Sequence, residues 1–216
     1  LQEHDPDRVT EIFADLDRQT AEPYTAAKAE MDAALAERLG VAVEDLRPWH
    51  YADPFVQEAP VVSDFDLDTL YEGQDLLEIA RRYYKSFGLD PEPILDDSDV
   101  LPREGKSPHA FCFTVDRDEP DVRVFLNLKP TDAWMDTTLH ELGHGFYDSY
   151  YDDTLPWVLR QPSHILTTEG VAMLFGEMSK NPIWLGENLE IDEETMPSVV
   201  AAAEEARVLQ KLVFAR

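Results

Sequence analysis

The sequence contains a single cysteine, Cys112, among 216 residues. No disulfide can form within the chain, so a reducing compartment such as the cytoplasm is favoured. There is no run of about 18 apolar residues, and no membrane-spanning segment is expected. A glycine-rich phosphate loop and a Ser-centred nucleophile turn are also missing, so neither kind of site is predicted.

Basic residues are scarce as well. The 18 Lys and Arg residues stand against 45 Asp and Glu residues, which gives a formal net charge of −27. Nucleic acids and anionic membranes both require a basic face, so neither is expected as a partner. Only six of the basic residues are lysine. An acid excess with few lysines suits a surface that tolerates salt, because screening removes its self-repulsion.

The apolar pattern predicts a mainly α fold with a small antiparallel β-ribbon. Hydrophobic residues make up 44% of the chain, enough to bury a core. We expect one piece of a larger domain with three stretches: a helical part over 1–106, the β-ribbon over 107–130, and metal-binding helices over 131–216. The β-rich runs HAFCFTV and VRVFLNL, separated by DRDEPD, predict the ribbon as a hairpin.

Capping signals and apolar spacing give the predicted helices. One begins at Pro6, a second runs from Pro23 to Gly40, and a third spans 70–87. Thr131 is expected to cap a helix that carries the metal motif, and Thr167 or Thr168 to cap the next one. A last apolar helix extends from about Pro197 to Arg216.

The stretch HELGH places His140 and His144 four residues apart. On a helix this is about one turn, so both imidazoles point the same way and can bind one Zn²⁺ ion. Glu141 lies one position round from His140, where it can reach a metal-activated water and accept its proton. The pattern predicts a catalytic metal site rather than two histidines on a packed face.

A catalytic zinc site needs a third protein ligand. A metzincin would have Gly and His where this chain has Tyr147 and Tyr150, so that class is excluded. Glu169 lies 25 residues after His144, in the first turn of the next predicted helix, which a helical hairpin could bring alongside. His164 lies in a loop beside a proline and is the less favoured alternative.

The residues HELGHGFYDSYYDDTLPWVLR, followed by TTEG, resemble the zinc peptidases of the angiotensin-converting enzyme family, whose zinc is held by HExxH and a later glutamate. The resemblance is specific over 111–170 and looser elsewhere. It implies His140, His144 and Glu169 as ligands of one zinc ion, Glu141 as the base, and a peptide as the substrate. It also implies a helical two-lobed domain with a deep cleft, of which this chain would be a part.

The run PHAFCF resembles the edge strand along that family's cleft, which implies that His109 and Ala110 hydrogen-bond the substrate backbone. One departure concerns the histidine ligands. The family has an Asp four residues after the glutamate, and this chain has Met173 there. Carboxylates at such places hold the imidazole orientation, so another group is needed; Asp136 and Asp148 are the candidates.

A second departure concerns length. In the family, the His and Tyr that stabilise the oxyanion, and the Lys and Tyr that bind the substrate carboxylate, lie about a hundred residues beyond the glutamate, whereas this chain ends 47 residues after Glu169. The sequence therefore predicts a processed or excised piece of a zinc peptidase that binds zinc and has weak or no activity by itself. A non-catalytic zinc module and an acidic helical interaction domain without metal are the alternatives. Exposed core surface would favour self-association.

Overall fold

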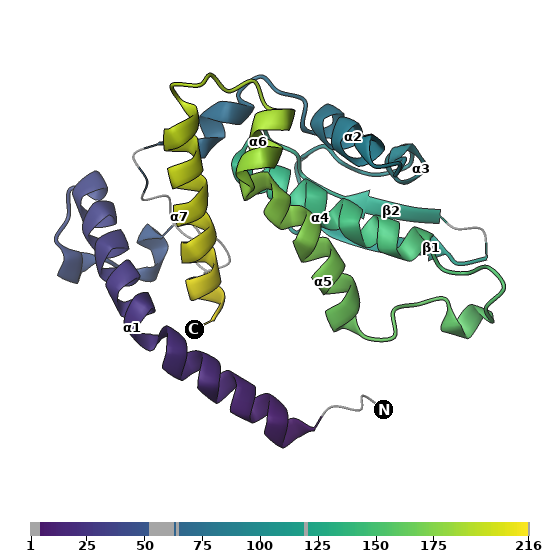
Figure 1. The fold of residues 1–216 in the computed structure, drawn as a ribbon, viewed down its shortest axis with the longest axis horizontal. Helices are drawn as coiled ribbons and strands as arrows, with labels where there is room; N and C mark the ends of the chain where they lie inside the picture. The colour runs from purple at the N-terminus through teal and green to yellow at the C-terminus, as the bar shows by residue number, and fades with distance from the viewer. Residues whose placement is uncertain (1–4, 52–62, 64, 119–120, 216) are drawn as a thin grey trace. The chain divides into compact units, whose positions relative to one another are not determined.

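The computed structural model describes residues 5–51, 63, 65–118 and 121–215. It confirms the mainly α fold with a small antiparallel β-ribbon (Figure 1). The chain divides into two compact units, one formed by residues 1–66 with 198–216 and the other by residues 67–197. Every candidate site residue named above belongs to the second unit.

The first unit contains the long helix α1, Pro6–Leu39. Asp5 caps its start by accepting from the backbone N–H of Asp7, and Gly40 ends it in the left-handed region at φ 67°. Two 3₁₀ turns follow, η1 (Val43–Asp45) and η2 (Pro48–His50). The hydroxyl of Tyr51 donates to Asp32 at 2.7 Å and holds this segment against the helix. Most of α7, Met196–Phe214, also belongs to this unit.

The second unit begins with the 3₁₀ turn η3 (Leu67–Tyr71), then α2 (Leu76–Ser86) and the short α3 (Glu92–Leu95). The hairpin follows as β1 (Phe111–Asp116) and β2 (Asp121–Phe125), paired antiparallel with an irregularity between Thr114 and Asp116. Residues 98–100 run along the far side of β2, where Asp99 bridges to Phe125. Within the described residues, β1 pairs only with β2, so its other edge is open.

The centre of this unit is α4, Asp132–Ser149. It contacts both strands, α2, and α5 (Ile165–Gly176) (Figure 1). Met135, Leu139 and Leu142 of α4 are fully buried. The buried hydroxyl of Tyr84, in α2, donates to the carbonyl of Leu139 at 2.7 Å. The helix is thus wrapped on several sides by its own unit, which fixes the direction of its polar face.

The remaining elements complete the second unit: η4 (Trp157–Leu159), η5 (Glu177–Lys180) and α6 (Pro182–Asn188). Asn181 caps α6 by accepting from the backbone N–H groups of Ile183 and Trp184. Among the described residues, no helix has the length and apolar character needed to cross a membrane.

Several predicted boundaries were wrong. The two helices expected from Pro6 and Pro23 are a single helix that continues through Pro23. The helix expected over 70–87 begins only at Leu76, because Asp75 accepts from the N–H groups of Leu77 and Glu78 and so caps it there. The cap at Thr131, the hairpin and the final helix agree with expectation. The stretches 1–106, 107–130 and 131–216 describe the order of elements and do not coincide with the two compact units.

Candidate metal centre

Two neighbouring helices bring His140, His144 and Glu169 together. Nε2 of His140 lies 3.6 Å from one carboxylate oxygen of Glu169, and Nε2 of His144 lies 3.6 Å from the other. The candidate ligand atoms of the three residues all lie within 4.8 Å of one another. The side chains of His140 and His144 are 25% and 14% exposed and that of Glu169 is 42% exposed, so the group is open on one side.

Close contact between α4 and α5 makes this arrangement possible. Gly143, between the two histidines, faces α5, and a Cβ atom placed there would lie 2.9 Å from the Cα of Ala172. It would also lie 3.0 Å from the ring of Phe175. A side chain at position 143 would therefore push the helices apart. The glycine of HELGH sets the distance between the helix that carries two imidazoles and the helix that carries the carboxylate.

Glu141 is buried, with 8% of its surface exposed. Burial, and after it the negative charge of Glu169, raise the pKa of its carboxyl to about 7, although a hydrogen bond from the backbone of Cys112 acts in the opposite direction. Cys112 belongs to β1, so this carboxyl connects α4 to the strand with the open edge. A pKa near 7 suits a group that must both accept and release a proton at neutral pH.

The donor set fits a zinc ion. Two imidazoles and one carboxylate are the ligands of one common class of catalytic zinc site. Bonds of about 2.1 Å in a tetrahedron place neighbouring ligand atoms about 3.4 Å apart, close to the 3.6 Å separations at Glu169. Burial lowers the pKa of His140, and the adjacent His144 lowers it further, whereas Glu169 raises it. A lowered pKa favours the neutral imidazole, which is the form that binds metal.

Asp148, one of the two carboxylates expected to orient a histidine, is engaged elsewhere. Asp148 accepts from the hydroxyls of Thr114 and Tyr151, at 3.0 and 3.1 Å. One carboxylate oxygen of Asp136 lies 3.9 Å from Nζ of Lys180. The partner of His144 is instead Thr168, whose Oγ1 lies 2.7 Å from Nδ1 of the imidazole. Sequence reasoning missed this role, although Thr168 stands next to the predicted ligand Glu169.

His164, the alternative third ligand, has a different place in the structure. It caps α5, and its Nδ1 accepts from the backbone N–H of Leu166 at 3.0 Å. The predicted caps Thr167 and Thr168 both lie inside the helix, and Glu169 therefore stands in the second turn rather than the first. The geometry favours Glu169 over His164, since only Glu169 joins the two histidines in a metal-sized group.

His109 and Ala110 immediately precede β1 and lie outside the strand itself. The amide of Asn127 donates to the carbonyls of Ser107 and Pro108, at 2.8 and 3.3 Å, and anchors the chain just before them. His109 is exposed. Because the backbone of Cys112, two residues beyond Ala110, is a hydrogen-bond partner of Glu141, this segment leads directly to that carboxyl.

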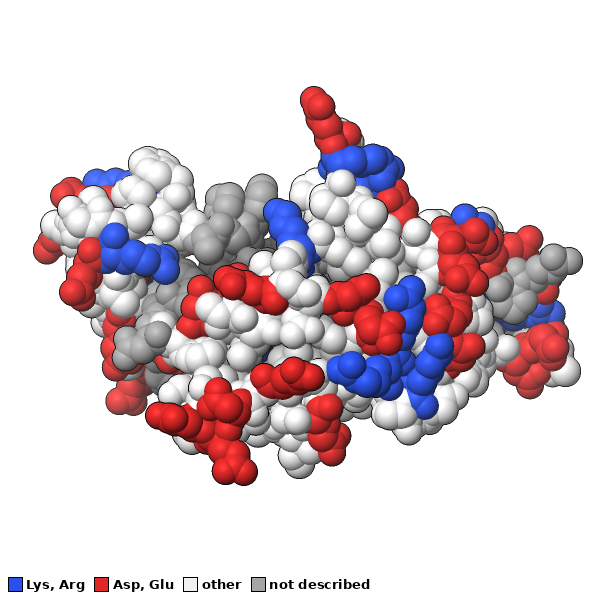
Figure 2. Space-filling model, turned by 90° about the horizontal axis from the view of Figure 1, so that it is seen from above, with Lys and Arg blue, Asp and Glu red and all other residues white. Residues whose placement is uncertain are grey.

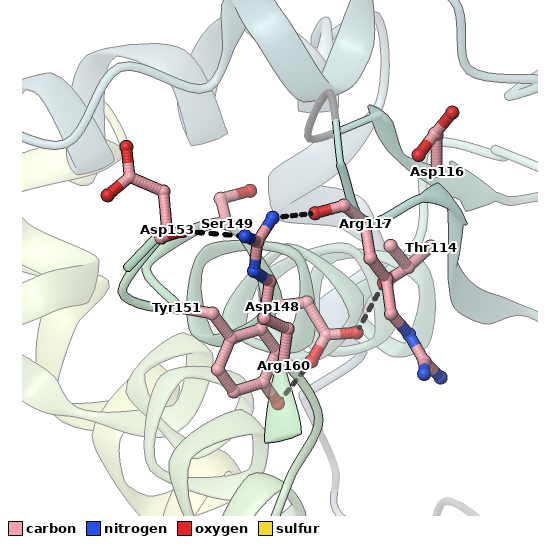
Figure 3. A pocket seen from close by; sticks show the side chains of 8 residues that line it. All are labelled: Thr114, Asp116, Arg117, Asp148, Ser149, Tyr151, Asp153 and Arg160. Atoms are coloured by element: carbon pink, nitrogen blue, oxygen red, sulfur yellow. Dashed lines mark hydrogen bonds between the residues drawn. The ribbon is translucent and has the colours of Figure 1, made fainter. Parts of the chain in front are cut away.

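A separate pocket lies beyond the C-terminal half of α4 and is lined by Thr114, Asp116, Arg117, Asp148, Ser149, Tyr151, Asp153 and Arg160 (Figure 3). Arg160 donates to the carbonyls of Leu155, Arg117 and Asp153 at 2.9, 2.9 and 2.6 Å. The guanidinium of Arg117 lies 4.8 Å from the ring centre of Trp157. These contacts hold the connection over residues 150–160 against the turn of the hairpin. The polar groups that line the pocket are therefore largely paired with other parts of the chain.

No protein-family model matches the chain, and no curated protein matches it.

Proposed function

We propose that this chain binds one Zn²⁺ ion through His140, His144 and Glu169 and that the centre serves to hydrolyse peptide bonds. The observation that carries the proposal is the pair of 3.6 Å separations that join both imidazoles to the two oxygens of one carboxylate. The buried Glu141 beside this group supports a reactive centre over a purely structural one. Structural zinc sites are usually closed by four protein ligands, whereas this group offers three and is open on one side.

Glu141 is the proposed proton carrier. A zinc ion bound here would lower the pKa of its water to about 7 and polarise the substrate carbonyl. The carboxylate of Glu141 accepts the proton of the attacking water and passes it to the nitrogen of the leaving amine. The hydrogen bond from the backbone of Cys112 keeps the carboxylate directed to one place.

The open edge of β1 is the proposed binding place of the peptide backbone. An extended peptide can add to an exposed strand edge through main-chain hydrogen bonds. His109 and Ala110 lead into this strand and would contact the peptide next to the bond that is cut. The side chains of Phe111, Phe113 and Val115 are 42%, 39% and 53% exposed on one face of β1 and offer apolar contacts to such a peptide.

Metal content tests the ligand set directly. Native mass spectrometry of the zinc-loaded protein should give one Zn²⁺ per chain, and Glu169→Ala should lose it. His164→Asn is the matched control: asparagine can still cap α5, so this variant should keep the ion. Loss of zinc from His164→Asn with retention in Glu169→Ala would identify His164 as the ligand and contradict our assignment.

Peptide cleavage tests the reaction. We expect at most weak zinc-dependent cleavage of a mixed peptide library by this chain, and that cleavage should disappear in Glu141→Gln while the bound zinc remains. A wild-type chain that holds zinc and gives no detectable cleavage even on prolonged incubation would favour the alternative of a non-catalytic zinc module, and cleavage that persists in Glu141→Gln would contradict the role of Glu141. A chain that takes up no zinc would leave the acidic helical interaction domain as the better description.

We also propose that the protein self-associates through α5. This helix is apolar on its exposed side too, with Ile165, Leu166 and Leu174 at 62%, 68% and 59% exposure. A helix that is apolar all round normally has both faces covered. Gel filtration should give a mass above that of one chain, and Leu166→Glu should reduce it. A monomeric wild-type protein would contradict this.

A further inference from the structure

The residue immediately before Glu169 is buried directly against one of the imidazoles. Thr168 is 5% exposed, and its hydroxyl oxygen lies 2.7 Å from Nδ1 of His144. On the other side of the same ring, Nε2 faces Glu169 at 3.6 Å. His144 is therefore held at one nitrogen by Thr168 and presents its other nitrogen to the candidate metal position.

The two nitrogens of a neutral imidazole are not equivalent. One carries a proton and the other carries a lone pair, and only the lone pair binds a metal ion. If the hydroxyl oxygen of Thr168 accepts the proton of Nδ1, then Nε2 is bare and directed at Glu169. A partner at the far nitrogen of a ligating histidine fixes both the tautomer and the ring orientation.

We infer that Thr168 is the positioning residue of His144 and holds it as the Nδ1–H tautomer that binds zinc through Nε2. This rests on the zinc site proposed above. Thr168 supplies the hydrogen bond for which a carboxylate at position 173 was expected. Met173 is 50% exposed, whereas Thr168 is buried and its hydroxyl lies beside Nδ1 of the imidazole. Two consecutive residues of α5 therefore act at the proposed site: Thr168 hydrogen-bonds the ligand His144, and Glu169 is itself a ligand.

The first test compares zinc affinities. Thr168→Val keeps the size of the buried side chain and removes the hydroxyl. Competition with a chromophoric chelator should show Zn²⁺ binding weakened about 10- to 100-fold, the usual loss when such a partner is removed. Thr168→Ser should restore most of the affinity. Thr167→Val, at the exposed neighbouring position, is the matched control and should bind zinc like the wild type.

The second test is spectroscopic and begins with the wild-type protein. In the zinc-loaded wild-type protein, the Nδ1–H proton of His144 should be protected from solvent exchange and visible by ¹H–¹⁵N NMR, with a cross-peak to the side chain of Thr168. Thr168→Val should lose that protection, whereas a purely structural role would leave the resonance in place. A wild-type protein that binds zinc but shows no protected Nδ1–H overturns the inference.

The outcomes separate the two proposals. If the wild-type chain takes up no Zn²⁺, the proposed metal site itself fails. If it binds one Zn²⁺ and Thr168→Val binds the ion equally well, the metal site stands and the role of Thr168 is refuted.

Discussion

At the scale of single residues, β1 contacts the side chain of Glu141 through the backbone of Cys112. The contact is a hydrogen bond, and the side chain of Cys112 is itself half-buried. Burial raises the pKa of this thiol above its ordinary range, and the negative charges of Asp148 and Glu141 raise it further. A thiol in such surroundings stays protonated, since ionisation would place a third negative charge beside two carboxylates.

We therefore predict that Cys112 is slow to react. In the folded protein at mildly alkaline pH, iodoacetamide should alkylate it at least about tenfold more slowly than it alkylates a free thiol, because the reactive species is the thiolate. Because its pKa is raised, the rate should keep climbing with pH beyond about 8.5, where an ordinary thiol levels off. Mass spectrometry over time gives the rate, and the urea-unfolded chain is the control. Equal rates in the folded and unfolded chains would show that the thiol is accessible.

Residue spacing predicted part of the site and missed part of it. His140 and His144 are one helical turn apart, so a helix alone suffices to align them. Glu169 could be selected because it follows on the next helix. The role of Thr168 could not be found in this way, since the residue beneath a particular imidazole depends on how two helices are rotated against each other. The same holds for His164, whose capping function has no sequence signal as clear as that of Ser, Thr, Asp or Asn.

At the scale of elements, the contact between α4 and α5 controls the site. We predict that Gly143→Ala lowers the free energy of unfolding by about 1–3 kcal/mol, since the new Cβ would overlap the backbone of α5. Zinc binding should weaken as well, because Glu169 moves away with the helix. Chemical denaturation and chelator competition measure the two effects.

Gly170→Ala is the matched control for this substitution. A Cβ at position 170 meets nothing within 4 Å, so the variant should be as stable as the wild type or slightly more stable, by about 0.5–1 kcal/mol, as expected for Gly→Ala inside a helix. If Gly143→Ala matched Gly170→Ala in stability, the close contact would not be what sets the helix spacing.

The start of α4 is joined to η5 by an ion pair between Asp132 and Lys180. Both oxygens of the carboxylate lie within 2.8 Å of Nζ, and the side chains are 15% and 10% exposed. Burial raises the pKa of Asp132, while Lys180 acts in the opposite direction. We predict that Lys180→Met destabilises the protein by about 3–5 kcal/mol at neutral pH, because it leaves a buried carboxylate unpaired.

This loss should shrink in acid. The pKa of Asp132 is raised in the folded state, so the folded protein takes up the proton more readily than the unfolded chain, and protonation stabilises it as the pH falls. The difference between Lys180→Met and the wild type should therefore be smaller near pH 4 than near pH 7. Denaturation curves at the two pH values measure it, and a difference that grows in acid would contradict the assigned role of the pair.

Helices and strands could be predicted where a short stretch of sequence is enough to determine them. The hairpin followed from two β-rich runs, and the start of α4 from the cap at Thr131. The helix boundary at Pro23 was wrong because a single proline removes one hydrogen bond and can be carried inside a long helix that continues on both sides. The late start of α2 was missed because the apolar residues Leu70 and Tyr71, which belong to the 3₁₀ turn η3, extend the apolar pattern to the N-terminal side of the cap at Asp75.

At the scale of the whole molecule, the acidic excess dominates the surface. Figure 2 shows Asp and Glu side chains spread over the face in view, with Lys and Arg in smaller groups. With a formal net charge of −27, the folded state repels itself at low ionic strength. The Debye length falls from about 10 Å at 0.1 M salt to about 3 Å at 1 M.

We predict that the melting temperature rises as KCl increases from about 0.1 M to about 1 M. Differential scanning calorimetry measures it, and an uncharged solute at matched osmolality is the control. A melting temperature that falls with salt would show that attractive ion pairs outweigh the repulsion.

The position of Glu169 relative to the histidines has a consequence for folding. A chain with one cysteine cannot form an internal disulfide, yet a metal ion shared by α4 and α5 would act as a cross-link that closes the 25-residue stretch between His144 and Glu169. The stabilisation of the folded state would depend on the concentration of free zinc. At a thousand times the dissociation constant, binding contributes about 4 kcal/mol. The second unit would then be held together by an ion that a chelator can withdraw.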